Sequence, residues 1–253
     1  PVLESFISDP VLIDMLFCPL MYYGNAREGD MDFYQFVIMF KSIFIEGFSK
    51  PEGGMHYILH LMAERFKELG GELKMGNGVK TINASAGTVG SVTLENEEEL
   101  DTVAVLSSMG YVETLNRCQP ELAETGTCET GQVSFMESLF VVDKEPRELG
   151  YDRSIVFFST QPRFNYKVPA DLIDISSGVL CCSNNFKYPK PLEEGLIRLT
   201  NLASFDKWDS LPRKDYIAAK KEWRGRALEE LFTFSPDFRD NVVFLDSFTP
   251  KTI

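Results

Sequence analysis

One helix, closed by two glycines and followed at once by short alternating strands, limits this chain to folds that combine helices with a sheet. Apolar side chains recur at three- and four-residue steps through residues 55–69, and Gly70 and Gly71 then stop the helix. Alternating or apolar segments follow at 72–75, 79–82, 88–94 and 102–106, with an acidic turn at 96–99. The pattern predicts a helix, a β-meander and one further buried strand.

The remainder of the chain supplies more helices and a second set of strands. Clustered aromatic and apolar residues over 10–48 predict buried or ligand-facing helices, and residues 212–232 return to helical spacing. Strand-like segments occur at 133–142, 154–159, 178–183, 196–202 and 241–245. Strands of this kind, interleaved with polar loops, are best buried in a mixed sheet with flanking helices, so the expected fold class is α+β.

Composition excludes several classes of function. The 253 residues carry a formal net charge of −13, which opposes the phosphate backbone of nucleic acids. The five cysteines form no CxxC pair, so buried or free thiols in a reducing cytoplasm are expected rather than disulfides or a zinc site. No apolar run approaches the roughly 18 residues of a membrane span.

The block Phe48-Ser49-Lys50-Pro51-Glu52-Gly53-Gly54-Met55, with the following helix and Leu69-Gly70-Gly71-Glu72, carries a family resemblance. It resembles the internal signature of phytoene desaturases, carotene isomerases and related flavoprotein amine oxidases. The order of the later pieces is similar too, from the 79–82 strand to Phe248-Thr249-Pro250. The resemblance covers nearly the whole chain.

The resemblance implies a domain organisation and a set of cofactor contacts. Residues 1–50 would be the helical part of a substrate domain, 51–125 the middle of an FAD-binding domain, and 126–253 a mixed-sheet substrate domain. The residues implied beside the cofactor are Gly53, Gly54, Met55, Val79, Ser107 and Ser108, with Met109 next to them. For the two glycines, a tight helix entry that needs unusual backbone angles is an equally good explanation.

Two family features are absent from this sequence. Intact members open with a Gly-x-Gly-x-x-Gly turn that holds the FAD diphosphate at a helix N-terminus, and they close with a second glycine-rich flavin segment. Neither is present here. We therefore expect an internal fragment, with FAD bound by the intact parent and absent from this chain.

The implied function is the substrate-binding portion of an FAD-dependent oxidoreductase acting on an apolar, carotenoid-like molecule. Because the flavin performs hydride transfer in this family, no catalytic side chain is assigned. The aromatic and methionine-rich stretch 33–48 would line the substrate channel, although ordinary core packing explains it as well. The alternative is a non-catalytic module that binds an apolar ligand or a protein partner.

Two smaller features have competing interpretations. His56, His60 and Glu64 share a helix face and resemble a metal site, but Tyr57 replaces the glutamate of a zinc protease, so a solvated face is preferred and no metal is expected. The basic side of the 212–232 helix suits either a plain surface helix or peripheral contact with an anionic membrane. The oligomeric state is not indicated.

Overall fold

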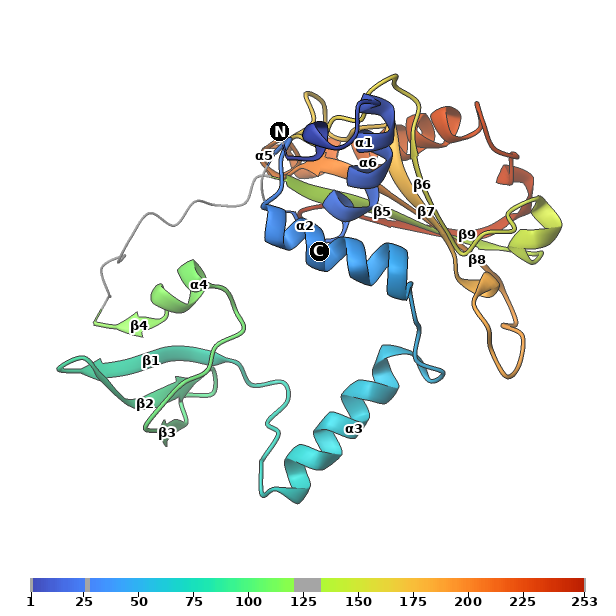
Figure 1. The fold of residues 1–253 in the computed structure, drawn as a ribbon. Coiled ribbons are helices and arrows are strands. Elements are labelled where there is room, and N and C mark those ends of the chain that lie inside the picture. The colour runs from blue at the N-terminus through green and yellow to red at the C-terminus, as the bar shows by residue number, and fades with distance from the viewer. Residues whose placement is uncertain (1, 26–27, 121–132, 253) are drawn as a thin grey trace. The chain divides into compact units, whose positions relative to one another are not determined.

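The computed structural model describes residues 2–25, 28–120 and 133–252. It has an α+β fold, as the sequence predicts, divided into two compact units (Figure 1). The first unit combines Pro1–Glu52 with Gly131–Ile253, and the second comprises Gly53–Thr130. Each unit has its own sheet and is described separately.

The first unit is built on a five-stranded sheet. In spatial order its strands are β6 (Ile155–Ser159), β7 (Ser177–Cys182), β8 (Gly195–Ser204), β5 (Val133–Val142) and β9 (Val242–Phe248). All of its pairings are antiparallel, and β5 and β8 pair from Val133 with Ser204 to Val142 with Gly195 without a register shift. The sequence predicts a mixed sheet for this part of the chain. The sheet is instead antiparallel, since neighbouring strands run in opposite directions throughout.

One face of this sheet packs against helix α6 (Arg213–Leu231). Alternate residues of β5 and β8 point into this core, including Phe140 and Leu199, which are fully buried. Trp223 and Leu228 of α6 contact them from the helix side. Burying one such side chain contributes on the order of 2–3 kcal/mol, so this face supplies most of the apolar burial of the unit.

The opposite face is partly covered by α1 (Pro10–Tyr22) and α2 (Phe33–Phe40), drawn in blue in Figure 1. Asp9 caps α1 through Val11 N–H and Asp32 caps α2 through Tyr34 N–H, which satisfies the first free amides of each helix. A π-helical turn, Lys41–Glu46, follows α2 directly. The helices expected over residues 10–48 are thus present. The unit also contains α5 (Phe205–Asp209) and 3-10 turns at Leu3–Ser5, Pro146–Leu149, Ser183–Asn185 and Arg239–Asn241.

The second unit begins with α3 (Gly54–Glu68), which confirms the helix predicted at 55–69. Its mixed four-stranded sheet has the order β3-β2-β1-β4, with β1 (Val79–Ser85), β2 (Thr88–Leu94), β3 (Glu99–Asp101) and β4 (Cys118–Gln119). The short helix α4 (Tyr111–Leu115) precedes β4, which pairs with β1 in parallel. The strands predicted at 79–82 and 88–94 are β1 and β2, whereas β3 was not predicted and begins at the end of the expected acidic turn.

Two predicted strands of this unit are wrong. Residues 72–75 and 102–106 have no strand geometry. Val103 and Leu106 are 93% and 102% exposed, so the buried strand expected there is instead an open segment. An apolar strand is stable only when other layers cover it and pair with it, and within the described residues nothing does so here.

Two further expectations concern the state of the cysteines and the presence of membrane-spanning helices. Cys18, Cys118, Cys181 and Cys182 are free and buried, as expected for structural thiols, whereas Cys128 lies outside the described residues. In the part of the chain that the structure describes, no helix has the length and apolar character to cross a membrane.

Candidate functional site

A cavity of about 640 Å³ opens in the first unit between α1, α2 and the loop that contains residues 163–166. Its apolar wall comes from all three segments: Ile13, Phe17, Met21, Met31, Phe33, Phe36, Phe164 and Tyr166. Three of these, Met21, Met31 and Phe36, are themselves buried members of the core between the helices and the sheet. We refer to this space as the aromatic cavity.

The rings of the aromatic cavity are packed against one another. Phe36 lies 5.4 Å from Phe17 and 6.3 Å from Phe33 between ring centroids. On the loop side, Tyr22 lies 6.2 Å from Phe164 and 6.3 Å from Tyr166. These separations fall in the range of favourable aromatic pairs, so the wall is held in place by its own contacts.

Hydrogen bonds fix the loop to the helices. Asp14 of α1 accepts from the Arg163 guanidinium, with Nη2 3.2 Å from Oδ1, and from the Phe164 amide at 3.1 Å. The Tyr166 hydroxyl donates to the Asn25 carbonyl at 2.9 Å. The loop therefore presents Phe164 and Tyr166 to the cavity in a defined position.

Other carboxylates also line the aromatic cavity, but two of them already accept structural hydrogen bonds. Asp32 accepts the Tyr34 amide at the start of α2, and Asp30 accepts the Met31 amide. With Asp14 engaged by Arg163, three carboxylates of the lining are thus used in contacts within the protein.

The thiol and the phenols beside the cavity are held in their neutral forms. Burial raises the pKa of the Cys18 thiol to about 12, and the nearby Asp14 charge adds to the effect. Burial likewise raises the pKa of Tyr166 to about 12 and lifts the pKa of Tyr22 well above its ordinary value. These groups therefore supply neutral walls near pH 7 rather than a nucleophile or a base.

The residues that the family resemblance placed beside the cofactor all lie in the second unit. Gly53 is the N-cap of α3, Gly54 begins the helix with φ of +68°, and Met55 is 61% exposed. Val79 begins β1 and pairs with Leu94. No hydrogen bond within the described residues joins these positions, and none of them lines the aromatic cavity.

The two serines lie in the same unit, in the segment that precedes α4. Ser107 accepts a hydrogen bond from Thr114 at 2.7 Å and from the Met109 amide at 3.3 Å. Ser108 adjoins it in the chain, and neither serine lines the aromatic cavity. Gly54 shows the unusual backbone angle that the structural explanation of the glycines requires.

The aromatic stretch 33–48 contributes to the cavity only through Phe33 and Phe36. Phe40 and Phe44 continue the row of rings, 5.0 Å apart, while Tyr34 is 80% exposed. The loop residues Phe164 and Tyr166 were missed because the segment was treated as a polar connection. The sequence contains one indication of their role: two aromatic residues follow Arg163 closely in a loop that has no strand pattern.

The basic face of α6 is partly used within the protein. Lys220 contacts Asp246 at 3.0 Å and Arg224 donates to Ser247 at 3.1 Å. Lys214 and Lys221, on the same side of the helix, make no ion pair or hydrogen bond with the residues that the structure describes. His56 and His60 are exposed on α3, and no group of three metal-ligating side chains occurs among the residues that the structure describes.

Comparison with known proteins found no matching family model and no curated protein that matches. Two solved structures are similar in fold. An oxidoreductase from Methanosarcina mazei aligns over 98% of this chain and 55% of its own, with a TM-score of 0.59 and 16% identity. The PF1083 protein from Pyrococcus furiosus aligns over 97% and 56%, with a TM-score of 0.62 and 13% identity. The chain thus spans about half the length of these structures and shares its fold with them.

Proposed function

We propose that this chain forms the substrate-binding portion of an FAD-dependent oxidoreductase that acts on an apolar, carotenoid-like molecule. The aromatic cavity is the observation that carries the proposal. Its volume of about 640 Å³ lies in the range of about 300–1,000 Å³ found for small-molecule sites. The apolar part of its wall consists mainly of rings and methionines, which gain affinity by burying apolar surface, and charged side chains complete the lining.

The packing of the wall supports binding of a rigid apolar molecule. Phe36 contacts Phe17 and Phe33, and Asp14 holds the loop that carries Phe164. A wall that is already ordered costs little entropy when a ligand enters, so more of the buried area appears as affinity. Such a site orients the substrate and excludes water, while the reaction itself needs a cofactor.

In such an oxidoreductase, bound FAD would supply hydride transfer. Gly54 fits an approach by the cofactor, since no atom lies within 4 Å of the position that a Cβ would occupy, and no side chain caps the start of α3. The other implied contacts are Gly53, Met55, Val79, Ser107 and Ser108. These positions offer edge contacts without a diphosphate cradle, so we expect FAD in the intact parent and no stoichiometric FAD on this chain.

The domain assignment belongs to the same proposal. Residues 1–50 and 126–253 would form the substrate domain, and 51–125 the middle of the FAD-binding domain. Support comes from the solved oxidoreductase, of which this chain covers 55%, and from the position of the aromatic cavity in the first unit. We propose that the enzyme is cytoplasmic and that it draws its substrate from a membrane surface through α6.

The proposal is tested by titrating the chain with retinol, an apolar polyene whose absorption overlaps tryptophan emission. Saturable quenching is expected for the unaltered chain. Phe36→Ala should weaken binding about tenfold, because losing one ring of the wall removes on the order of 1–2 kcal/mol of apolar contact. The matched control is Phe66→Ala on α3, a residue that does not line the cavity and should leave binding unchanged.

Quenching that never saturates, or equal weakening by Phe36→Ala and Phe66→Ala, would contradict the assignment of the aromatic cavity. The non-catalytic alternative makes the same binding prediction. It is separated from the enzyme by the absorbance of the full-length product, which would lack the visible bands of a flavin.

A further inference from the structure

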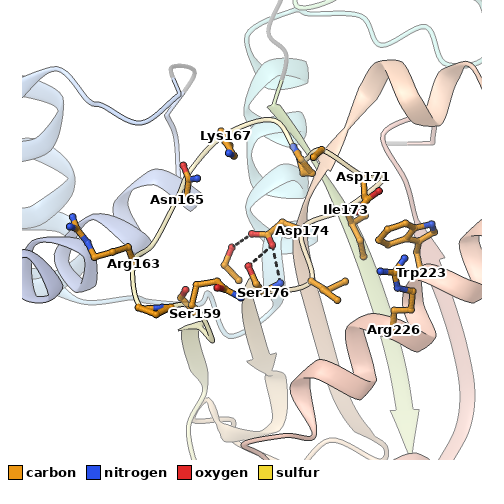
Figure 2. A pocket seen from close by; sticks show the side chains of 16 residues that line it. Ser159, Arg163, Asn165, Lys167, Asp171, Ile173, Asp174, Ser176, Trp223 and Arg226 are labelled. Atoms are coloured by element: carbon orange, nitrogen blue, oxygen red, sulfur yellow. Dashed lines mark hydrogen bonds between the residues drawn. The ribbon is translucent and has the colours of Figure 1, made fainter.

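A second cavity, of about 490 Å³, lies in the first unit between the 159–177 segment and α6 (Figure 2). It shares Arg163 and Asn165 with the aromatic cavity but has a different character. Cationic and hydrogen-bonding side chains line it, among them Lys167, Arg226 and Ser159. Trp223 and Ile173 form its apolar part.

Arg226 is held in a geometry suited to an anion. Its guanidinium carbon lies 3.9 Å from the centroid of the Trp223 ring, so the group stacks on the indole. A stacked guanidinium keeps its N–H edge available for bidentate bonds to a carboxylate or phosphate. Figure 2 shows Arg226 and Trp223 together on the α6 side of the cavity.

Two of the three cations that line this cavity, Arg226 and Lys167, lack acidic partners. Across residues 2–25, 28–120 and 133–252, neither Arg226 nor Lys167 makes an ion pair or a hydrogen bond. By contrast, Arg163 is paired with Asp14.

The acidic residues of the cavity oppose an anion only weakly. Asp174 accepts from the Ser176 amide at 2.9 Å and from the hydroxyls of Ser176 and Ser177 at 2.6 Å. Figure 2 shows these bonds turning its carboxylate into the loop. Asp171 is exposed, where water screens its charge.

We propose that this cavity binds a small organic anion through a carboxylate or phosphate group, with Arg226 as the principal contact and Lys167 as the second. The proposal is independent of redox chemistry and of the aromatic cavity. Stacking on Trp223 preorganises Arg226, so the anion gains two directed bonds without ordering a free side chain.

The test titrates the full chain with inorganic phosphate and, separately, with succinate, and follows tryptophan fluorescence. Trp223 lies under Arg226, and the fully buried Trp208 donates to the Leu172 carbonyl of the segment that lines the cavity, so both indoles report on this region and Trp223 is the one beside Arg226. A saturable change with either anion is expected, and the anion that produces it identifies the group recognised. Arg226→Gln should weaken binding at least about tenfold, the loss typical of a charge-assisted bond.

Two further variants keep the result interpretable. Lys167→Gln should weaken binding by a smaller factor while Arg226 still covers Trp223, and Asp171→Asn should tighten it by less than about twofold, because water screens the Asp171 charge. The control is Lys221→Gln, an exposed cation of the same helix that does not line the cavity. Thermal melts establish that each variant is folded. The absence of a saturable change with both anions, or equal weakening by Arg226→Gln and Lys221→Gln, would overturn the proposal.

Discussion

At the scale of single residues, the direction of one buried hydrogen bond can be deduced from its partners. Ser177 has one hydroxyl proton, and it is donated to the Asp174 carboxylate at 2.6 Å. The Tyr22 hydroxyl lies 2.9 Å from Ser177 Oγ, so in this pair Tyr22 must be the donor and Ser177 the acceptor. This arrangement needs a protonated phenol, in agreement with a Tyr22 pKa well above its ordinary value.

Tyr22→Phe should therefore lower the free energy of unfolding by about 1 kcal/mol, the usual net value of a buried neutral hydrogen bond. Ser177 keeps its bond to Asp174, so no larger penalty is expected. Urea unfolding measures the change, with Tyr34→Phe as the control because Tyr34 is 80% exposed. A Tyr22→Phe protein as stable as the control would show that this bond contributes nothing.

The thiols give a second residue-scale prediction. Burial raises the pKa of Cys18 and of Cys182 to about 12, so at pH 8 roughly one thiol in ten thousand is ionised. Both should resist iodoacetamide in the folded chain and react readily after unfolding in urea. Peptide mass spectrometry assigns each site, and rapid alkylation of Cys18 in the folded chain would contradict the packing of α1.

The raised phenol pKa values also predict how the stability of the folded chain depends on pH. Burial raises the pKa of Tyr151 and Tyr166 to about 12, so the folded state keeps protons that the unfolded state loses from about pH 10. Stability should be intact below about pH 10 and should fall as the pH rises toward 12. Tyr166→Phe should make this fall shallower in urea melts, and an unchanged slope would contradict the burial of its hydroxyl.

At the scale of elements, replacing two helical glycines by alanine should change stability in opposite directions. Gly54 starts α3 at φ of +68°, a conformation that costs a residue with a Cβ roughly 1–2 kcal/mol. Gly225 lies inside α6 with nothing within 4 Å of an added Cβ, so alanine there should gain about 0.5–1 kcal/mol. Amide exchange should become faster in α3 for Gly54→Ala and slower in α6 for Gly225→Ala. Exchange rates that change in the same direction in both variants would contradict the different roles assigned to Gly54 and Gly225.

Element type was predictable wherever the residue period was clear. The β2 and β5 segments have the predicted ends, and α6 differs from its prediction by one residue at each end. The 102–106 segment shows the limit, because Val103-Ala104-Val105-Leu106 has strand composition but finds no pairing partner among the described residues. Pairing depends on distant chain segments, which local periodicity does not encode.

The site was less predictable than the fold for a related reason. Helical spacing pointed to Phe33 and Phe36, but the opposite wall comes from a loop whose position depends on Asp14, about 150 residues earlier in the chain. A bond of that kind, like the stacking of Arg226 on Trp223, follows from tertiary structure alone.

At the scale of the whole molecule, α3 has no buried residue in the part of the chain that the structure describes. Leu59, Met62 and Phe66 are 55%, 64% and 46% exposed, and clustered apolar surface of this kind promotes association. The double variant Leu59→Lys with Met62→Lys should reduce self-association, measured by static light scattering. Phe6→Lys, at an isolated residue that is 82% exposed, is the control and should have a smaller effect.

The central claim is most directly tested by the visible absorbance of the purified full-length product beside that of this 253-residue chain. We predict the bands of bound oxidised flavin for the full-length product, bleaching when an apolar polyene substrate is added without oxygen, and no flavin bands for the chain alone. A colourless full-length product, or a 253-residue chain that holds FAD stoichiometrically, would contradict the account.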